Sequence, residues 1–148
     1  MLYNYVGEVD RRATYFVSYL SNVKCIIHTG ASPSSQGRGE RDSATLYIFD
    51  RSVIATDASG NELRYIPYDQ WACTDDKSGC WTLSPDGDDY FFIADQECAT
   101  KAGIAKSGES FASTGRAAHL PSKRFKINGF SRLKQGSPRM WHFKVVGG

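Results

Sequence analysis

The final segment of the chain alternates apolar and polar side chains in the way that a β-strand with one buried face requires. Trp141, Phe143 and Val145 alternate with His142, Lys144 and Val146, which is the period of two typical of a half-buried strand. A chain end is normally frayed unless a sheet holds it in place. Because this segment carries some of the best core residues of the sequence, we expect it to be a structural strand.

Other strand candidates follow at short intervals and are rich in β-branched and aromatic residues. The expected strands are Leu2–Val9, Thr14–Leu20, Val23–His28, Thr45–Asp50, Leu63–Ile66, Cys80–Leu83, Asp89–Ala94, Phe125–Leu133 and Met140–Val146. Pro85-Asp86-Gly87 predicts a hairpin between two of these strands, and Pro67–Trp71 predicts one helical turn anchored by Trp71. With 148 residues, the chain is expected to form one domain, residues 1–148. The fold class is all-β, a small barrel or sandwich with long inserted loops and little helix.

Two segments break the strand pattern. Residues 29–42 have almost no apolar side chain to bury and predict a flexible loop. Residues 97–122 contain three glycines and few sizeable apolar side chains, which predicts a long loop over the surface or an arm that packs on a partner. A short helix is expected at Ala99–Ala105.

The net charge of +2 hides a strong asymmetry along the chain. Residues 1–100 hold eight basic and fifteen acidic residues, whereas residues 101–148 hold ten basic residues and one acid. A basic segment of this kind meets nucleic acid, the acidic half of a neighbouring copy, or acidic loops of the same chain. For contacts between copies, the expected basic face is Lys123, Arg124, Lys126, Arg132 and Lys134, and the expected acidic face is Asp75, Asp76, Asp86, Asp88 and Asp89.

The sequence contains no convincing catalytic or metal-binding pattern. It has no GxSxG, HExxH or P-loop motif, and its three histidines are scattered. We therefore expect no catalytic residues, no metal and no cofactor. No apolar run approaches the roughly 20 residues that span a bilayer, and no secretory signal is visible. Free thiols are accordingly expected for the four cysteines, although Cys73 and Cys80 have a spacing that permits pairing in an oxidising setting.

Three stretches of the sequence together resemble one known family of proteins. The first is Asp42–Ile48, a Ser-Ala start to a core strand after a variable loop. The second is Ile66–Trp71, followed by Cys80–Leu83 and Asp88–Phe92. The third is a strand around Ile127–Leu133, then Gly136-Ser137-Pro138 and the ending Trp141–Gly148. In this order and spacing they resemble the minor capsid or head–tail connector proteins of tailed phages.

The resemblance implies a stopper, a small β-barrel whose copies form a ring of six or twelve subunits at the neck of the virion. Such a ring closes the DNA channel, meets the portal or adaptor proteins on one side, and meets the tail terminator or tail tube on the other. A long inter-strand loop projects toward the channel, which implies that Gln36, Arg38 and Arg41 face DNA phosphates without base reading. The implied location is the virion neck, after assembly in the host cytoplasm and without a membrane.

Three alternatives remain open at the level of sequence. The tail terminator is also a β-rich ring protein of phages. A nucleic-acid-binding β-module would use aromatic side chains interleaved with Lys and Arg on one sheet face. A small secreted β-domain would contain two disulfides.

Overall fold

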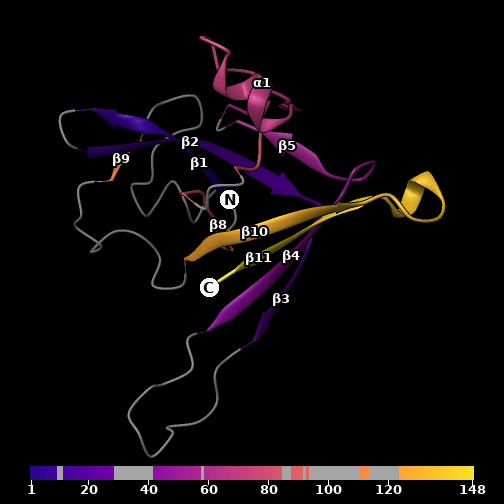
Figure 1. The fold of residues 1–148 in the computed structure, drawn as a ribbon. Helices are drawn as coiled ribbons and strands as arrows, with labels where there is room; N and C mark the ends of the chain where they lie inside the picture. Colours follow the sequence, from indigo (N-terminus) through magenta and orange to yellow (C-terminus); the bar gives the residue numbers. More distant parts are fainter. Residues whose placement is uncertain are drawn as a thin grey trace, which may run out of the picture.

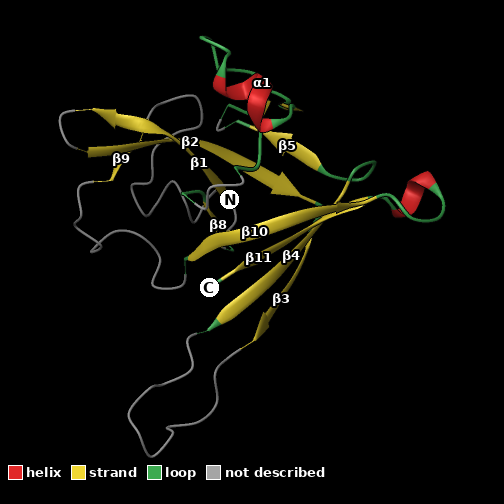
Figure 2. Cartoon of the chain, viewed as in Figure 1, coloured by secondary structure: helices red, strands yellow, loops and turns green. Residues whose placement is uncertain are grey.

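The fold is that of a computed structural model, which describes residues 1–9, 12–28, 42–57, 59–84, 88–91, 93, 111–113 and 124–148. The described part consists mostly of β-strands, long and short, with one short α-helix (Figure 2). The strands are β1 (Leu2–Val9), β2 (Arg12–Ser21), β3 (Lys24–His28), β4 (Ser43–Phe49), β5 (Ile54–Thr56), β6 (Arg64–Tyr65), β7 (Cys80–Trp81), β8 (Tyr90–Phe91), β9 (Phe111–Ser113), β10 (Phe125–Leu133) and β11 (His142–Gly147). The helical elements are α1 (Tyr68–Ala72) and the 3₁₀ turn Pro138–Met140.

Nine strands form one curled antiparallel sheet with the order β3-β4-β11-β10-β8-β1-β2-β5, and β9 pairs with β2 beside this path. The sheet bends into a half-barrel (Figure 1). A separate parallel pair joins β6 to β7. The all-β prediction is therefore confirmed.

The alternating segment near residue 148 is an inner strand of this sheet. β11 pairs with β10 on one side and with β4 on the other. Beyond β11, the Gly148 and Lys126 backbones exchange hydrogen bonds in both directions, at 3.1 and 3.3 Å. Phe143 and Val145 are buried, as the alternation predicts.

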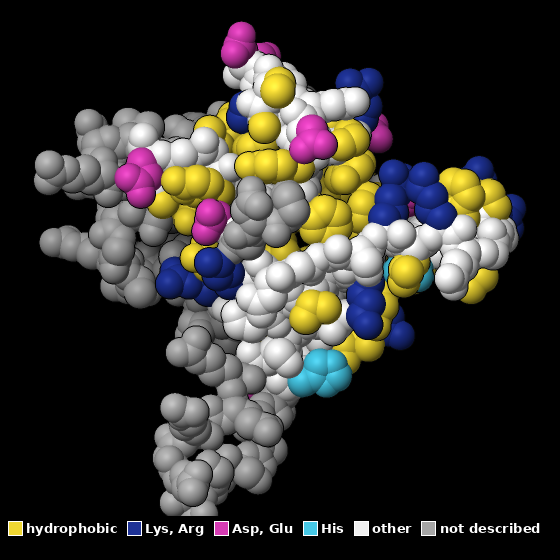
Figure 3. Space-filling model, viewed as in Figure 1, with side chains coloured by type: hydrophobic (Ala, Val, Ile, Leu, Met, Phe, Trp, Pro, Cys, Tyr) yellow, Lys and Arg dark blue, Asp and Glu magenta, His cyan; other side chains and the backbone are white. Residues whose placement is uncertain are grey.

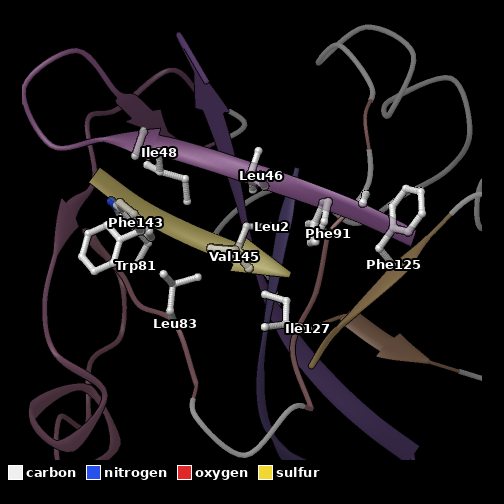
Figure 4. Close-up of a cluster of buried hydrophobic side chains, with 12 residues drawn as sticks. Leu2, Leu46, Ile48, Trp81, Leu83, Phe91, Phe125, Ile127, Phe143 and Val145 are labelled. Carbon is white, nitrogen blue, oxygen red and sulfur yellow. The ribbon is translucent and has the colours of Figure 1, made fainter. Parts of the chain in front are cut away.

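The core of the half-barrel lies on its concave face. In β4, buried residues alternate strictly with half-buried ones, so Ala44, Leu46 and Ile48 point inward. They meet side chains from five other segments of the chain, as Figure 4 shows for Leu2, Trp81, Leu83, Phe91, Phe125, Ile127, Phe143 and Val145. Apolar burial of this kind contributes roughly 1.5–3 kcal/mol for each large side chain.

A second buried cluster is built around tyrosines of β1 and β2. The Tyr15 ring lies edge-on to Tyr3, Tyr5 and Tyr90, with centroids 5.7–6.3 Å apart. Burial is the main cause that raises the pKa of Tyr15 to about 12. These tyrosines therefore serve as packing residues on the second face of the β1–β2 pair.

Several details differ from the sequence-based expectations. The hairpin expected around Pro85-Asp86-Gly87 is wrong, because β7 pairs with β6 while β8 lies between β1 and β10. β5 and β9 were not predicted. Residues 111–113, inside the expected surface excursion, pair with β2 of their own chain. Residues 29–41 of the expected loop 29–42, and the expected helix Ala99–Ala105, lie outside the described residues.

The apolar run 23–28 forms the edge strand β3, and this edge is only partly covered. Among the described strands, β3 pairs with β4 alone. Cys25 packs against the core from a half-buried position, whereas Ile26 and Ile27 are 37% and 40% exposed. An apolar edge of this kind is a natural place for a neighbouring chain to pair.

Candidate functional site

The predicted site residues fall into three groups: those outside the described residues, those on the surface and one in the interior. Gln36, Arg38 and Arg41 of the expected channel loop lie outside the described part of the chain, as do Lys123 and Asp86.

Asp89 is wrongly predicted as a surface acid. It is 1% exposed, and three donors surround its carboxylate. Asn4 Nδ2 donates to Oδ2, the Tyr5 backbone N–H donates to Oδ1 and the Ser84 N–H donates to Oδ2, each at 2.8 Å. Asn4 Nδ2 also donates to the Thr82 carbonyl at 2.8 Å. The carboxylate thus joins β1 to the segment between β7 and β8, and it is not a docking residue.

Burial raises the pKa of Asp89 from 3.8 to about 6, against the opposing effect of its hydrogen-bond donors. The folded chain therefore binds this proton more tightly than the unfolded chain does. The stability that comes from this tighter proton binding is fully present below about pH 4 and is lost as the pH rises through about 6, whereas the carboxylate keeps its three hydrogen-bond donors.

This linkage gives a testable pH dependence. Urea unfolding of the wild type and of Asp89→Asn should be compared at pH 4 and pH 7, because the amide does not titrate. The stability of the wild type relative to the variant is expected to fall by up to about 3 kcal/mol between these two pH values. A difference that does not change with pH would show that Asp89 has the same pKa in both states.

Two of the predicted basic residues form ion pairs within their own chain. The Lys126 ammonium lies 3.6 Å from a carboxylate oxygen of Asp88. Both side chains are about half exposed, so the pair contributes little to stability. The Arg132 guanidinium lies 2.7 Å from Asp50 Oδ2 and also packs over the Phe143 ring at 5.0 Å. The acidic partners of these residues are thus found in the same chain.

The remaining basic residues do not complete one continuous face. Arg124 lies over the Tyr90 ring at 5.5 Å, and Lys134 lies over the Trp141 ring at 5.4 Å. They stand at opposite ends of the long strand β10, roughly 30 Å apart at about 3.3 Å per residue. The structure therefore divides the predicted basic residues between the two ends of β10.

The predicted acids Asp75 and Asp76 lie in the turn after α1, and both are exposed. The Ser78 backbone N–H donates to Asp76 Oδ1 at 2.9 Å. Hydrogen bonds from Ser78 lower the pKa of Asp76, which keeps it charged. Four acids of the predicted acidic face are among the described residues. Asp75 and Asp76 are the two that lie on the surface and form no ion pair within the described part of the chain.

A surface that was not predicted lies on the convex side of β3, β4 and β11. We call it the β4 outer face. The strand registers align Lys24, Tyr47 and Lys144 in one row across the sheet. In the next row, His142 is paired with Phe49 and its ring lies 5.3 Å from Phe49 and 5.8 Å from Tyr47. In the row on the other side, Ile26 and Val146 flank Thr45.

Charge is one-sided on the β4 outer face. None of its residues on β3, β4 and β11 is acidic; they are Lys24, Ile26, His28, Ser43, Thr45, Tyr47, Phe49, His142, Lys144 and Val146. Figure 3 shows basic, histidine and hydrophobic side chains together along this side of the molecule. The sequence contained one signal of this surface. The outward-facing positions of β4 include the aromatic residues Tyr47 and Phe49, where a solvated strand normally has polar side chains.

A cavity of about 290 Å³ opens beside the β3 edge. The residues that line it are Met1, Leu20, Val23, Cys25, Leu46, Phe91 and Ile93, whose side chains are apolar apart from the Cys25 thiol. These side chains do not provide the convergent polar groups that orient ligands in most small-molecule sites. Within the described ranges, no group of three or more His, Cys, Asp or Glu residues is arranged to hold a metal ion. No helix in the described part of the chain is long and apolar enough to cross a bilayer.

Comparison with known proteins identifies no relative. No family model matches the sequence, and no curated protein or solved structure matches significantly.

Proposed function

We propose that the chain is a structural subunit of a tailed-phage virion, a connector of the stopper type that forms a ring at the neck, closes the DNA channel and joins head to tail. One observation carries the proposal: the segments that resemble this family pack against one another. β4, from the first segment, pairs with β11, from the last. The Trp81 ring of the middle segment lies 6.4 Å from the Phe143 ring of β11. The resemblance thus involves the positions that build the core.

A non-catalytic role agrees with the hydrogen bonding of the one buried carboxylate described above. The buried carboxylate of Asp89 accepts hydrogen bonds from three donors on two segments of the chain, as expected of a structural group. The surfaces offered to neighbours are the β3 edge and the exposed acids after α1. In a head-to-tail ring, each copy contributes two different faces, and these two surfaces belong to different parts of the fold (Figure 1).

The experiment that tests the proposal is electron microscopy of particles from a phage or prophage in which this gene is inactivated. DNA-free or leaking heads beside separate, finished tails are expected, and a wild-type copy supplied in trans should restore joined particles. Normal infectious particles without the gene would overturn the proposal. Deletion of residues 36–41 in the same system should cause loss of packaged DNA if Arg38 and Arg41 face the channel.

The contact between copies has a separate test. Complementation with Asp75→Lys/Asp76→Lys is expected to yield at least tenfold fewer infectious particles than the wild type, since two exposed acids would then repel a basic neighbour. The control is Asp69→Lys, an exposed acid in the first turn of α1. Equal titres for both variants would remove Asp75 and Asp76 from the interface.

A further inference from the structure

We propose that the β4 outer face binds single-stranded nucleic acid, with bases stacked on its aromatic rings and phosphates held by its lysines. This inference rests on the geometry of the sheet and does not depend on the proposed connector function.

The first argument is the placement of the rings. Tyr47 and Phe49 are two residues apart on β4, so their side chains leave the same face about 7 Å apart along the strand. The His142 ring lies beside both of them. All three side chains are half-buried and keep part of their surface open to solvent. Aromatic side chains on an open sheet face are a common platform for unpaired bases, and they tolerate any base because every base has a π-face.

The second argument is charge. Lys24 and Lys144 flank Tyr47 in the same row, one strand away on either side. Lys24 is exposed and Lys144 half-buried. A cation on each side of a stacking ring fits the phosphates on either side of a stacked base. The absence of carboxylates from the β4 outer face removes the repulsion that an acidic residue would exert on a polyanion.

The third argument selects a single strand over a duplex. A duplex presents its phosphates and groove edges but keeps its bases stacked on one another, so it gains from Lys24 and Lys144 and not from Tyr47 and Phe49. A strand with free bases gains from both sets of residues. The neighbouring row adds the apolar side chains of Ile26 and Val146, which are 37% and 40% exposed. They extend the surface that a base can contact beside the rings.

The test is fluorescence anisotropy of the purified full chain with labelled oligothymidylate, oligouridylate and a duplex of the same length. Binding of the single strands is expected in the micromolar range at low salt, with weaker binding of the duplex. Tyr47→Leu keeps apolar bulk but removes the ring, and it should weaken single-strand binding at least fivefold. The matched control Tyr68→Leu removes a half-buried tyrosine from α1 and should leave binding unchanged.

Salt dependence tests the lysines separately. Lys24→Gln/Lys144→Gln is expected to flatten the slope of log affinity against log salt by about 1.4, because each phosphate contact to a single strand contributes about 0.7. Arg64→Gln, at an exposed position on β6, is the control and should leave the slope unchanged. Unfolding midpoints of all variants establish that they are folded.

Three outcomes would overturn the proposal. One is no binding of either single strand at about 100 µM protein and low salt, a concentration at which non-specific contacts already appear. Another is equal affinity of folded Tyr47→Leu and the wild type for single strands, which would leave only charge attraction. The third is equal loss of binding in Arg64→Gln and in the double lysine variant. The binding measurements are independent of the electron microscopy test. If the connector proposal fails there, the binding results still decide whether the β4 outer face binds single strands.

Discussion

Replacing Asp89 with alanine is expected to lower the free energy of unfolding by about 3 to 4 kcal/mol at pH 7. The change removes the acceptor for three donors, and the backbone N–H groups of Tyr5 and Ser84 then lose the partner that the carboxylate provides. Each buried donor left without a partner costs about 1–3 kcal/mol. Urea unfolding followed by tryptophan fluorescence measures the loss.

The adjacent acid provides the control. Asp88 has a side chain that is 55% exposed and pairs with Lys126 at 3.6 Å, so Asp88→Ala is expected to change stability by less than about 0.5 kcal/mol. Equal effects of the two substitutions would mean that the hydrogen bonds around Asp89 contribute no more than a surface ion pair.

Gly147→Ala is expected to destabilise the fold by about 2 to 3 kcal/mol. A Cβ at this position would lie 2.7 Å from Phe91 Cε1, 2.9 Å from Phe125 Cβ and 3.0 Å from the Lys126 carbonyl oxygen. One of these neighbours is backbone in the adjacent strand and cannot rotate away, so β11 and β10 must separate locally. Overpacking in a close-packed core typically costs 1–3 kcal/mol. Thermal unfolding followed by circular dichroism gives the shift in the midpoint.

The next residue in the chain is a matched control. At Gly148 the nearest neighbour of an added Cβ is Asn128 Nδ2 at 3.4 Å, an ordinary contact with a side chain that can move. Gly148→Ala should therefore leave the midpoint within about 1 °C of the wild type. If both variants melt together, the close approach of β11 to Phe91 and Phe125 has no energetic consequence.

Most of the large sheet was predictable because its long strands bury one face. β4 and β11 show the period of two in their burial as they do in their sequence, and β10 begins and ends where the pattern predicts. Strands of three residues gave no such signal. β5 and β9 are defined by their pairing with β2, which lies far away in the sequence.

Pairing partners were the part of the fold that local chemistry did not determine. Pro85-Asp86-Gly87 has the residues of a tight turn, but Tyr90 and Phe91 find partners in β1 and β10 instead. β7 pairs with β6 and β8 pairs with the longer strands β1 and β10, and the Trp81 and Phe91 side chains of β7 and β8 are both buried in the core. The hairpin signal was therefore outweighed by tertiary packing.

The candidate sites show the same limit. An aspartate in a polar stretch is normally solvated, and nothing adjacent in the sequence reveals that Asn4 and Tyr5, more than 80 positions away, surround Asp89. The β4 outer face requires the registers of three strands to bring Lys24, Tyr47 and Lys144 into one row. The sequence shows that basic and aromatic residues are present. Only the strand order and registers show which of them are neighbours on the sheet.

The inner position of β11 sets the order of events during synthesis. Ribosomes deliver the chain from residue 1 onward, so β4 and β10 emerge before the strand that lies between them. Until residues 142–147 leave the exit tunnel, both strands present unpaired edges, and the apolar side chains of Leu46 and Ile48 lack their cover from Phe143 and Val145. The large sheet therefore closes only after residue 147 has emerged. Nascent chains that stall before residue 141 will expose adhesive edges and depend on chaperones or proteases for their removal.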